Sequence, residues 1–542
     1  MSYTSLNFLF FVATTVIVYF VFPVRKFRWT ILLIANAVFY AIVSYRSVAF
    51  ILFTTISTYL IALWLDKKSA ASSALLKEKK AEWSREEKKA FKEKTKKQKR
   101  LILTLCLVLN FGILAFMKYF NFFAGSLNDL LGSFSMEFSV PTLVLFNVAG
   151  ISYYTFQAMG YIIDVYREKI APQRNPLKLL LFTSFFPQIG QGPISSYDQL
   201  GDQLIEGHDF DFTRFKYACE LILWGLFKKL VLADRAAVAI AAVRENYADY
   251  NGTTLTFTIL LWAIQLYADF SGGIDMIRGV AQIFGVDMVE NFKRPYFSKS
   301  ISEYWRRWHI SLGAWMKNYV FYPIAMSNAF LTASKKMKGT RFGKTAAGAH
   351  IAKVLPTSVA SLVVFLLVGI WHGAEWKYVA FGVWNGGIIM LGILIQPLLD
   401  KLTDQLHINR ENIFFRLFQI FRTFLIVLVG YVFDVAPDFD QAMRTVGLFF
   451  TGQNFTMGFD QIGQLGIDTA GFVIIAICTV IIFIVSLIQE KVEPKGENIR
   501  TLLDRKPFMV RWLVLFFAIL IIAVFGVYGS GYNAADFVYM QF

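Results

Sequence analysis

Two histidines stand in sequence surroundings that suit chemistry. His309 lies in EYWRRWHISL, among tryptophans and arginines, and His372 lies in GIWHG at the end of a long apolar run. A neutral imidazole is an effective general base near pH 7, and an ionisable side chain at membrane depth is a functional hypothesis by default. Each histidine is therefore a candidate catalytic base. For either one taken alone, the alternative is a hydrogen-bonded structural histidine.

Motifs for other chemistries are missing from the sequence. It contains no HExxH motif and no cysteine cluster, which argues against a zinc site. Its three cysteines, Cys106, Cys219 and Cys478, lie in or near apolar runs and are interpreted as small core residues. A GxSxG nucleophile elbow, a Walker-type phosphate loop and a dinucleotide fingerprint in a suitable context are also missing. We therefore expect no metal site and no bound cofactor.

The composition indicates which elements must position the histidines. Of 542 residues, 56% are hydrophobic and 17% are charged, against about 25% charged in an average soluble protein. This excludes a soluble multi-domain enzyme, a disordered chain and a disulfide scaffold. Apolar runs long enough to approach a membrane span lie at 6–24, 29–43, 48–65, 101–120, 142–163, 217–233, 254–270, 354–371, 378–396, 413–433, 468–488 and 512–529.

These runs predict an all-α polytopic membrane protein, a bundle of about 11–12 transmembrane helices in which residues 1–542 form one domain. The first run is interpreted as a retained span because no site for signal-peptide cleavage follows it. The shorter apolar segment 179–193 contains two prolines and two glycines. We expect that segment to be broken or re-entrant.

The charge distribution predicts the orientation of the chain in the membrane. Residues 67–100 hold 14 Lys or Arg against five Glu, so 66–100 is expected to be a cytoplasmic insert, a helical hairpin or solvated helix. Residues 434–467 hold four Asp and one Arg, as suits an outside loop. Counting the intervening spans puts the N-terminus and the tail 530–542 on the extracytoplasmic side.

A second basic region, 291–353, has 12 Lys or Arg and a single acid. Its interspersed tryptophans favour interfacial amphipathic helices on the cytoplasmic side. Such a surface attracts either the anionic headgroups of the lipid bilayer or an acidic or phosphate-rich acyl donor. A nucleic-acid partner is not expected, because the basic residues do not sit on a soluble domain. The candidate donor-binding residues are Lys293, Arg294, Trp305, Arg306, Arg307, Lys335, Lys336 and Trp371.

Several ordered segments resemble a known family. They are ISYYTFQAMGYIIDVYRE from Ile151, FFPQIGQGPI from Phe185, YADFSGGIDMIRGVAQIFG from Tyr267, and the two histidine segments. The sequence resembles the membrane-bound O-acyltransferases, in particular the bacterial branch with alginate O-acetyltransferase and teichoic-acid D-alanyltransferase. The resemblance implies a helical bundle around a tunnel. It also implies that His372 is the essential catalytic histidine and His309 a second functional histidine.

The implied reaction joins an acyl thioester to a hydroxyl group. The donor is acetyl-CoA or an acyl carrier protein, and the acceptor is a cell-envelope or extracellular polysaccharide of a bacterium. His372 removes the hydroxyl proton, and His309 or a tryptophan N–H stabilises the oxyanion. Acetylation is favoured over D-alanyl transfer to teichoic acid. A transporter is disfavoured because no internal repeat is visible, and a non-catalytic scaffold is the remaining alternative.

The chain ends in FVYMQF, residues Phe537 to Phe542. For an arbitrary membrane protein, an aromatic anchor at the outer interface explains such an ending. The FxYxxF pattern also resembles the C-terminal motif of proteins that work with this family branch. That resemblance implies that Tyr539 accepts the acyl group and passes it to an extracytoplasmic serine-type acyltransferase.

Overall fold

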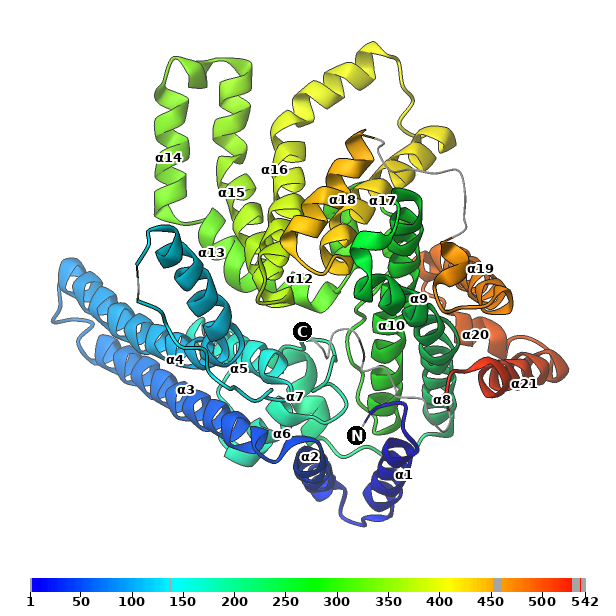
Figure 1. The fold of residues 1–542 in the computed structure, drawn as a ribbon. Helices are drawn as coiled ribbons and strands as arrows, with labels where there is room; N and C mark the ends of the chain where they lie inside the picture. The colour runs from blue at the N-terminus through cyan, green and yellow to red at the C-terminus, as the bar shows by residue number, and fades with distance from the viewer. Residues whose placement is uncertain (1, 137, 452–460, 529–536, 538–542) are drawn as a thin grey trace. The chain divides into compact units, whose positions relative to one another are not determined.

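The computed structural model describes residues 2–136, 138–451, 461–528 and 537 (Figure 1). Over these residues the regular secondary structure is helical, apart from one isolated antiparallel β-bridge between Phe292 and Trp308. This confirms the all-α prediction. The chain forms two compact units: Met1–Ala218 with Ile277–Val289, and Cys219–Met276 with Glu290–Phe542.

Nine segments among the described residues are long and apolar enough to span a membrane. They are Arg25–Ser44, Ser47–Glu78, Arg85–Ser133, Gly252–Ile283, Ala346–His372, Trp376–Gln405, Ile413–Val435, Thr469–Lys495 and Phe508–Phe525. Each coincides with a predicted apolar run, so the polytopic prediction is confirmed. The three remaining runs form shorter or interrupted helices, which makes this number smaller than the predicted 11–12.

Two local features explain the difference. Helix α1, Leu6–Val21, and helix α5, Ile151–Tyr166, have 16 residues each, and the stretch before α5, predicted to be helical from residue 142, has no regular structure up to Val148. The third run is interrupted because helix α8, Phe212–Leu226, passes into a π-helical segment, Phe227–Ala233, before α9, Asp234–Glu245, begins.

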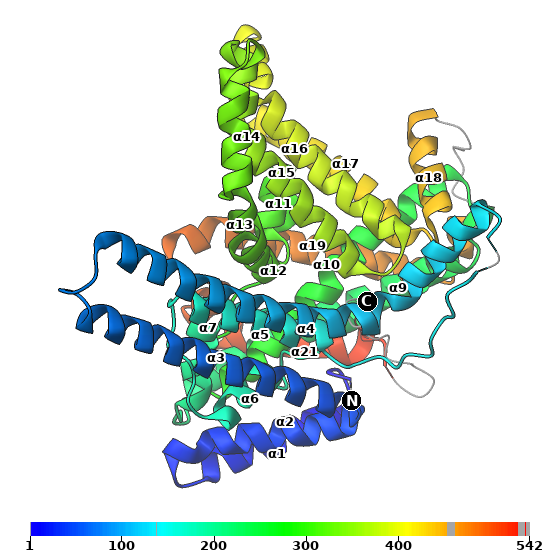
Figure 2. The same cartoon turned by 90° about the vertical axis from the view of Figure 1, so that its left-hand side faces the viewer.

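The first unit also contains α2 (Arg28–Ser44), α3 (Ser47–Glu78), α4 (Arg85–Ser133), α6 (Pro176–Ser184) and α7 (Tyr197–Ile205). Helices α3 and α4 lie side by side as an antiparallel hairpin (Figures 1 and 2). The turn is defined by a capping box in which Ser84 and Glu87 bond each other's backbone N–H.

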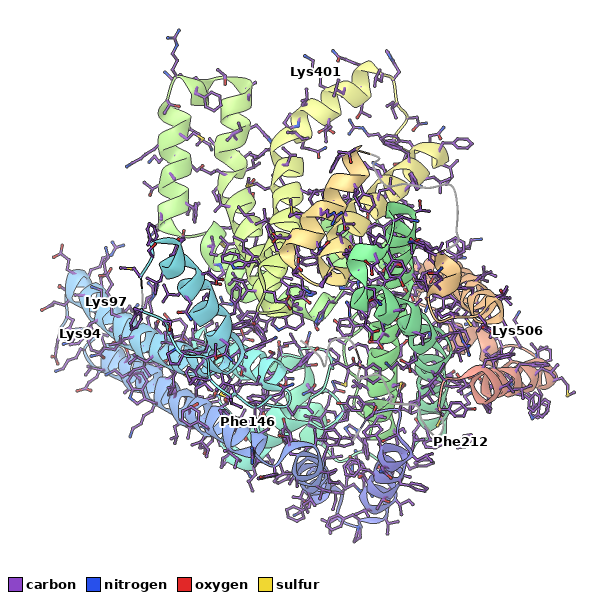
Figure 3. All side chains as sticks on the ribbon, viewed as in Figure 1. Lys94, Lys97, Phe146, Phe212, Lys401 and Lys506 are labelled. Carbon is purple, nitrogen blue, oxygen red and sulfur yellow. The ribbon has the colours of Figure 1, made fainter. Side chains whose placement is uncertain are left out.

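The hairpin of α3 and α4 extends beyond the length of a membrane span. The 49 residues of α4 correspond to about 74 Å of helix, whereas the hydrocarbon core is about 30 Å thick. Lys94 and Lys97 lie on the part of α4 near the turn (Figure 3). Lys99 pairs with Glu168, just after α5, at 2.8 Å. The helical hairpin expected for 66–100 is therefore present.

The predicted broken segment, 179–193, is helical up to Ser184 and non-helical and buried after it. Helix α6 ends at Ser184, and the following residues up to Ser196 are not helical. Their backbone is satisfied by side chains from the start of the chain: the Phe186 N–H donates to Asn36 Oδ1 at 2.9 Å, and the Gly190 N–H donates to Tyr3 Oη at 3.0 Å. Non-helical backbone in a membrane protein persists where protein atoms satisfy it in this way. Gly190 is required there because a Cβ atom would lie 2.7 Å from the Tyr3 ring.

The second unit is built from longer helices with short ones between them. It contains α9 (Asp234–Glu245), most of α10 (Gly252–Ile283), α11 (Ile301–Arg307), α12 (Ile310–Met316), α13 (Tyr322–Ala325), α14 (Asn328–Gly339), α15 (Ala346–His372), α16 (Trp376–Gln405), α17 (Ile413–Val435), α18 (Phe439–Thr451), α19 (Thr469–Val492), α20 (Ile499–Asp504) and α21 (Phe508–Phe525). Helices α15 and α16 pack together along much of their length (Figures 1 and 2).

The close packing of α15 on α16 depends on missing side chains. A Cβ atom at Gly369 would lie 2.2 Å from the Tyr378 carbonyl oxygen, and one at Gly382 would lie 2.5 Å from the Phe365 carbonyl oxygen. The backbones of the two helices therefore touch near the end of α15. This contact determines where His372, the last residue of α15, is placed.

Candidate active site

His372 lies at the C-terminal end of α15, with 4% of its surface exposed. Its imidazole centroid lies 4.9 Å from the Phe381 ring and 5.4 Å from the Trp371 ring. The helix ends directly after it because Gly373 is extended, with φ −179°. His372 is therefore buried within the protein and surrounded by aromatic rings.

His309 lies between α11 and α12, with 2% of its surface exposed and an unusual backbone φ of +44°. Its Nδ1 lies 3.3 Å from Asn291 Oδ1, and the same oxygen accepts the Ser311 N–H at 2.9 Å. Because that oxygen must act as an acceptor, Nδ1 carries the proton of the neutral ring, and Nε2 is the basic nitrogen.

The protonation state of His309 follows from its surroundings. The residue lies between the candidate spans, on no helix of spanning length. Burial and, to a lesser extent, charge repulsion from nearby His372 together lower the pKa of His309 from 6.5 to about 3. The imidazole of His309 is therefore neutral near pH 7.

Trp371 links the two histidines. Its ring centroid lies 5.6 Å from that of His309 and 5.4 Å from that of His372. The two histidine segments, far apart in the sequence, therefore meet at one tryptophan. Trp371, predicted from the sequence to bind the donor, therefore lies between the two histidine rings.

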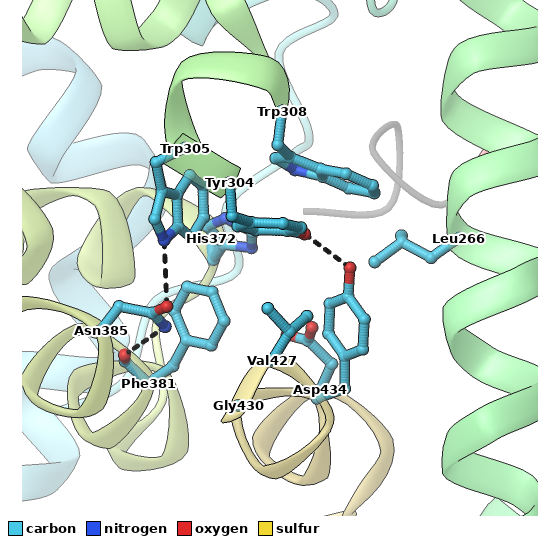
Figure 4. Close-up of a pocket in the computed structure, with 11 residues that line it drawn as sticks. Leu266, Tyr304, Trp305, Trp308, His372, Phe381, Asn385, Val427, Gly430 and Asp434 are labelled. Carbon is cyan, nitrogen blue, oxygen red and sulfur yellow. Dashed lines mark hydrogen bonds between the residues drawn. The ribbon is translucent and has the colours of Figure 1, made fainter. Parts of the chain in front are cut away.

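A small pocket opens against His372 (Figure 4). Its walls are mainly aromatic and apolar, with a few polar groups. The lining residues are Leu266, Tyr304, Trp305, Trp308, His372, Phe381, Asn385, Val427, Gly430, Tyr431 and Asp434. An aromatic wall of this kind excludes water and strengthens the electrostatic interactions inside the pocket.

Hydrogen bonds orient the polar groups of the pocket. The Tyr304 and Tyr431 hydroxyl oxygens lie 2.7 Å apart, and Trp305 Nε1 donates to Asn385 Oδ1 at 3.0 Å. Trp305, another predicted donor-binding residue, thus lies in the pocket wall. Since its N–H is already committed to Asn385, Trp305 is not available as the N–H that stabilises an oxyanion.

The basic donor-binding candidates divide into two groups. Arg294 pairs with Glu490 and with Glu493, the latter at 2.6 Å, and Arg307 pairs with Glu303 at 2.8 Å and with Glu490 at 3.3 Å. These arginines belong to an ion-pair network. Exposed Lys293 pairs with Glu290 at 3.3 Å, while Arg306, Lys335 and Lys336 are exposed.

Several residues of the site were missed from the sequence. Asn385 and Tyr431 are polar groups in apolar segments, a signal that could have indicated them. Asn291 and Tyr304 lie in charged segments, where no such signal is present. Asp434 was counted with the outside loop 434–467. That assignment was wrong, because Asp434 lies on α17 with 3% exposure.

The remaining predictions concern metal ligands and the tail. Over the described residues, no group of three His, Cys, Asp or Glu is arranged to hold a metal ion. Cys106 and Cys478 are buried as expected, whereas Cys219 is exposed, so its assignment to the core was wrong. Tyr539 lies outside the described residues.

Comparison with known proteins identifies the fold that carries this site. A sequence model of the membrane-bound O-acyltransferase family matches residues 97–338 and 351–432, which is more than half of the chain and includes both histidines. The chain belongs to the membrane-bound O-acyltransferase family. It is therefore a multi-pass membrane protein and an O-acyltransferase, which disfavours the transporter and scaffold alternatives.

The relatives of this O-acyltransferase have different named acceptors. The chain is 31% identical to a probable alginate O-acetylase of Pseudomonas putida, over 83% of this chain and 80% of the relative. It is 28% identical to a peptidoglycan O-acetyltransferase of Helicobacter pylori, over 64% of each chain. It is also 28% identical to a teichoic acid D-alanyltransferase of Bacillus subtilis, over 45% of this chain and 58% of the relative.

Proposed function

We propose that this O-acyltransferase moves an acetyl group from a cytoplasmic thioester across a bacterial plasma membrane, for esterification of a cell-envelope or extracellular polysaccharide. The observation that carries the proposal is the buried His372 in the wall of an aromatic pocket, next to Trp371 and His309. A base in a dry site is what a hydroxyl needs in order to attack a thioester without competing hydrolysis.

The proposed chemistry assigns proton transfer to His372. As the acceptor oxygen attacks the thioester carbonyl, its proton passes to His372. The tetrahedral intermediate then breaks the C–S bond, and the proton passes from His372 to the departing thiolate. The new C–O bond is the ester product. General base catalysis of this type contributes about 10²–10⁴-fold.

The oxyanion partner is better assigned to Trp371 than to His309. A neutral His309 with its proton on Nδ1 offers that proton to Asn291, so it has no second N–H for an oxyanion. An indole Nε1–H is a donor only, and the Trp371 ring lies beside His372. His309 then serves to position Trp371 through the contact between their rings.

Acetylation is the favoured acyl transfer because the alginate O-acetylase relative matches 83% of this chain, whereas the D-alanyltransferase relative matches 45%. D-alanyl transfer to teichoic acid is the second candidate. Mild alkali releases an ester-linked acyl group as free acid, so wall and extracellular polymers can be compared from cells with and without this gene. Loss of acetate supports acetylation, and loss of D-alanine supports the second candidate.

The donor is proposed to be acetyl-CoA or an acetylated carrier protein, approaching the basic cytoplasmic side. Purified protein in lipid vesicles, given either labelled donor, distinguishes the two by the label transferred. We also propose that the chain is oriented with this basic side in the cytoplasm and with both termini outside the cell. Labelling of a cysteine added to either terminus with an impermeant maleimide, in intact cells, tests that placement.

A relay by Tyr539 completes the proposal. Its phenol oxygen attacks the thioester carbonyl and the phenol proton passes to His372. The C–S bond then breaks, the departing thiolate takes the proton from His372, and the acyl group remains as a tyrosyl ester. A phenol has a pKa near 10, so this ester gives up its acyl group more readily than a sugar ester does. An extracytoplasmic transferase with a serine nucleophile then takes the acyl group to the polysaccharide.

A further inference from the structure

A buried ion cluster lies on the π-helical segment Phe227–Ala233, outside the pocket of His372. The Lys229 ammonium lies 2.8 Å from an Asp234 carboxylate oxygen and 2.7 Å from an Asp269 carboxylate oxygen. All three side chains are 1% exposed. A buried charge is strongly unfavourable without partners, so two carboxylates keep this ammonium in place.

The same ammonium faces an aromatic ring from the end of the chain. Lys229 Nζ lies 4.4 Å from the centroid of the Phe537 ring, and Phe537 is 1% exposed. A cation over an aromatic face is attracted to the ring, most strongly where water is excluded. Because the two carboxylates orient Lys229, its ammonium offers the Phe537 ring a fixed point of attraction.

The helix that carries Lys229 also binds the chain just before the tail. The Val527 N–H donates to the Leu230 carbonyl at 2.9 Å, and Arg235 donates to the Phe525 carbonyl at 2.7 Å. A π-helical turn shifts the helical bonding pattern and recurs at functional sites. Here the π-helical segment and the start of α9 contact the end of α21, Val527 just beyond it, and Phe537.

We propose that Lys229 is a positioning residue for the acyl relay. Its ammonium holds the Phe537 ring by the cation–π contact, here called the seat, and thereby restricts where Tyr539 meets the acyl group. The inference rests on the proposed relay function. Tyr539 follows Phe537 by two residues, so their α-carbons lie within about 7 Å. Without this contact, the chain from Val527 to Tyr539, twelve residues further on, could extend over about 40 Å, which lowers the effective concentration of the phenol at the site.

Substitutions in the tail test the seat without disturbing the helices. Phe537→Leu keeps an apolar side chain but removes the aromatic face, whereas Phe537→Trp keeps an aromatic face. After exposure of the purified full-length protein to labelled donor, mass spectrometry of the C-terminal peptide measures the rate of Tyr539 acylation. We expect a loss of about tenfold for Phe537→Leu and a rate near wild type for Phe537→Trp. Equal rates for the two variants overturn the proposal.

A double-mutant cycle tests whether Lys229 acts through Phe537. Lys229→Met and Phe537→Leu should together cost little more than Lys229→Met alone, because both remove the same contact. Lys228, the neighbouring buried lysine, pairs with Asp275 at 2.7 Å and provides the control. The effects of Lys228→Met and Phe537→Leu should multiply. If the effects of Lys229→Met and Phe537→Leu on the rate of Tyr539 acylation instead multiply, Lys229 has a purely structural role and the proposal is overturned.

A readout without activity separates failure of the seat from failure of the relay. In a Cys219→Ser background, which removes the exposed native thiol, a Gln541→Cys variant reports tail accessibility by its rate of maleimide labelling. Phe537→Leu should raise that rate several-fold, and an unchanged rate overturns the seat. A raised rate with no acyl ester on Tyr539 overturns the relay, and the positioning role with it.

Discussion

The imidazole of His309 and the indole of Trp371 meet edge to face, with ring centroids 5.6 Å apart. His309 follows a seven-residue helix, whereas Trp371 lies near the end of a 27-residue helix. Their contact joins two short motifs into one site, because Trp371 also contacts His372, which lines the pocket. The proposed division of roles, in which His372 is the base and His309 a positioning residue, follows from this contact.

His372→Ala should reduce acyl transfer by about 10²–10⁴-fold, the contribution of a general base. The substitution removes the imidazole at the pocket wall without changing the end of α15. Label transferred from the thioester donor measures the rate, and the thermal midpoint of the purified protein reports folding. His407→Ala, at an exposed histidine, is the control. Wild-type transfer by a well-folded His372→Ala protein contradicts the assignment.

Asn291→Ala should reproduce the effect of His309→Gln. Asn291 accepts hydrogen bonds from both His309 Nδ1 and the Ser311 N–H, so its loss frees the ring that supports Trp371. We expect each substitution to lower kcat about tenfold, with a smaller change in donor KM. Steady-state kinetics at varied donor concentration distinguish the two parameters. An intact kcat in Asn291→Ala would show that this hydrogen bond does not contribute to catalysis.

Acid should destabilise the protein partly through His309. Its pKa falls from 6.5 to about 3 on folding, so the unfolded chain binds a proton that the folded chain does not. The free energy of unfolding therefore decreases as the pH is lowered through about 6.5 and towards 3. His309→Gln has no such proton, so its thermal midpoint should fall less between neutral and mildly acidic pH. An identical pH dependence in both proteins would contradict the prediction.

Charge reversal at Lys335 and Lys336 should raise donor KM more than it lowers kcat. Both lysines are exposed on α14, so the effect should weaken as salt screens charges beyond about 10 Å at 0.1 M. Lys26→Glu, at an exposed lysine of the first unit, is the control. Unchanged donor kinetics would mean that these lysines contact lipid headgroups and not the donor.

Reversal at Arg294 or Arg307 should act differently. Each of these arginines already pairs with glutamates, so a glutamate in its place adds repulsion within the protein. We expect a lower thermal midpoint for these variants. Thermal unfolding of Arg307→Glu against the double substitution at Lys335 and Lys336 measures the contrast. A loss of donor affinity at unchanged stability would instead assign Arg307 to donor binding.

Tyr539→Phe should abolish polymer acylation at a normal protein level. The substitution keeps the aromatic ring and removes the phenol oxygen that accepts the acyl group in the proposed relay. Polymer-bound acyl groups released by alkali measure the effect. Tyr528→Phe, which removes a hydroxyl just after α21, is the control. Normal acylation in Tyr539→Phe would mean that the acceptor reaches the site itself.

Local patterns in the sequence predicted most of the helices. Nine of the twelve apolar runs form segments of spanning length, because an apolar run of about 20 residues has few other stable forms in a membrane. The broken segment after α6 was predictable from its prolines and glycines, since these residues interrupt a helix locally. The two histidines were also recognisable locally, from the tryptophans, arginines and glycines next to them in the sequence.

Contacts between distant segments could not be predicted, because they depend on packing rather than on local pattern. The pairing of Arg294 with Glu490 joins residues 196 positions apart, and it changes an apparently free cation into part of a network. The burial of Asp434 and the seat of Phe537 on Lys229 likewise require helices that are remote in sequence. The sequence alone determined which residues could do the chemistry. The close approach of α15 and α16 at Gly369 and Gly382, together with the turn before α12, decided which of them meet.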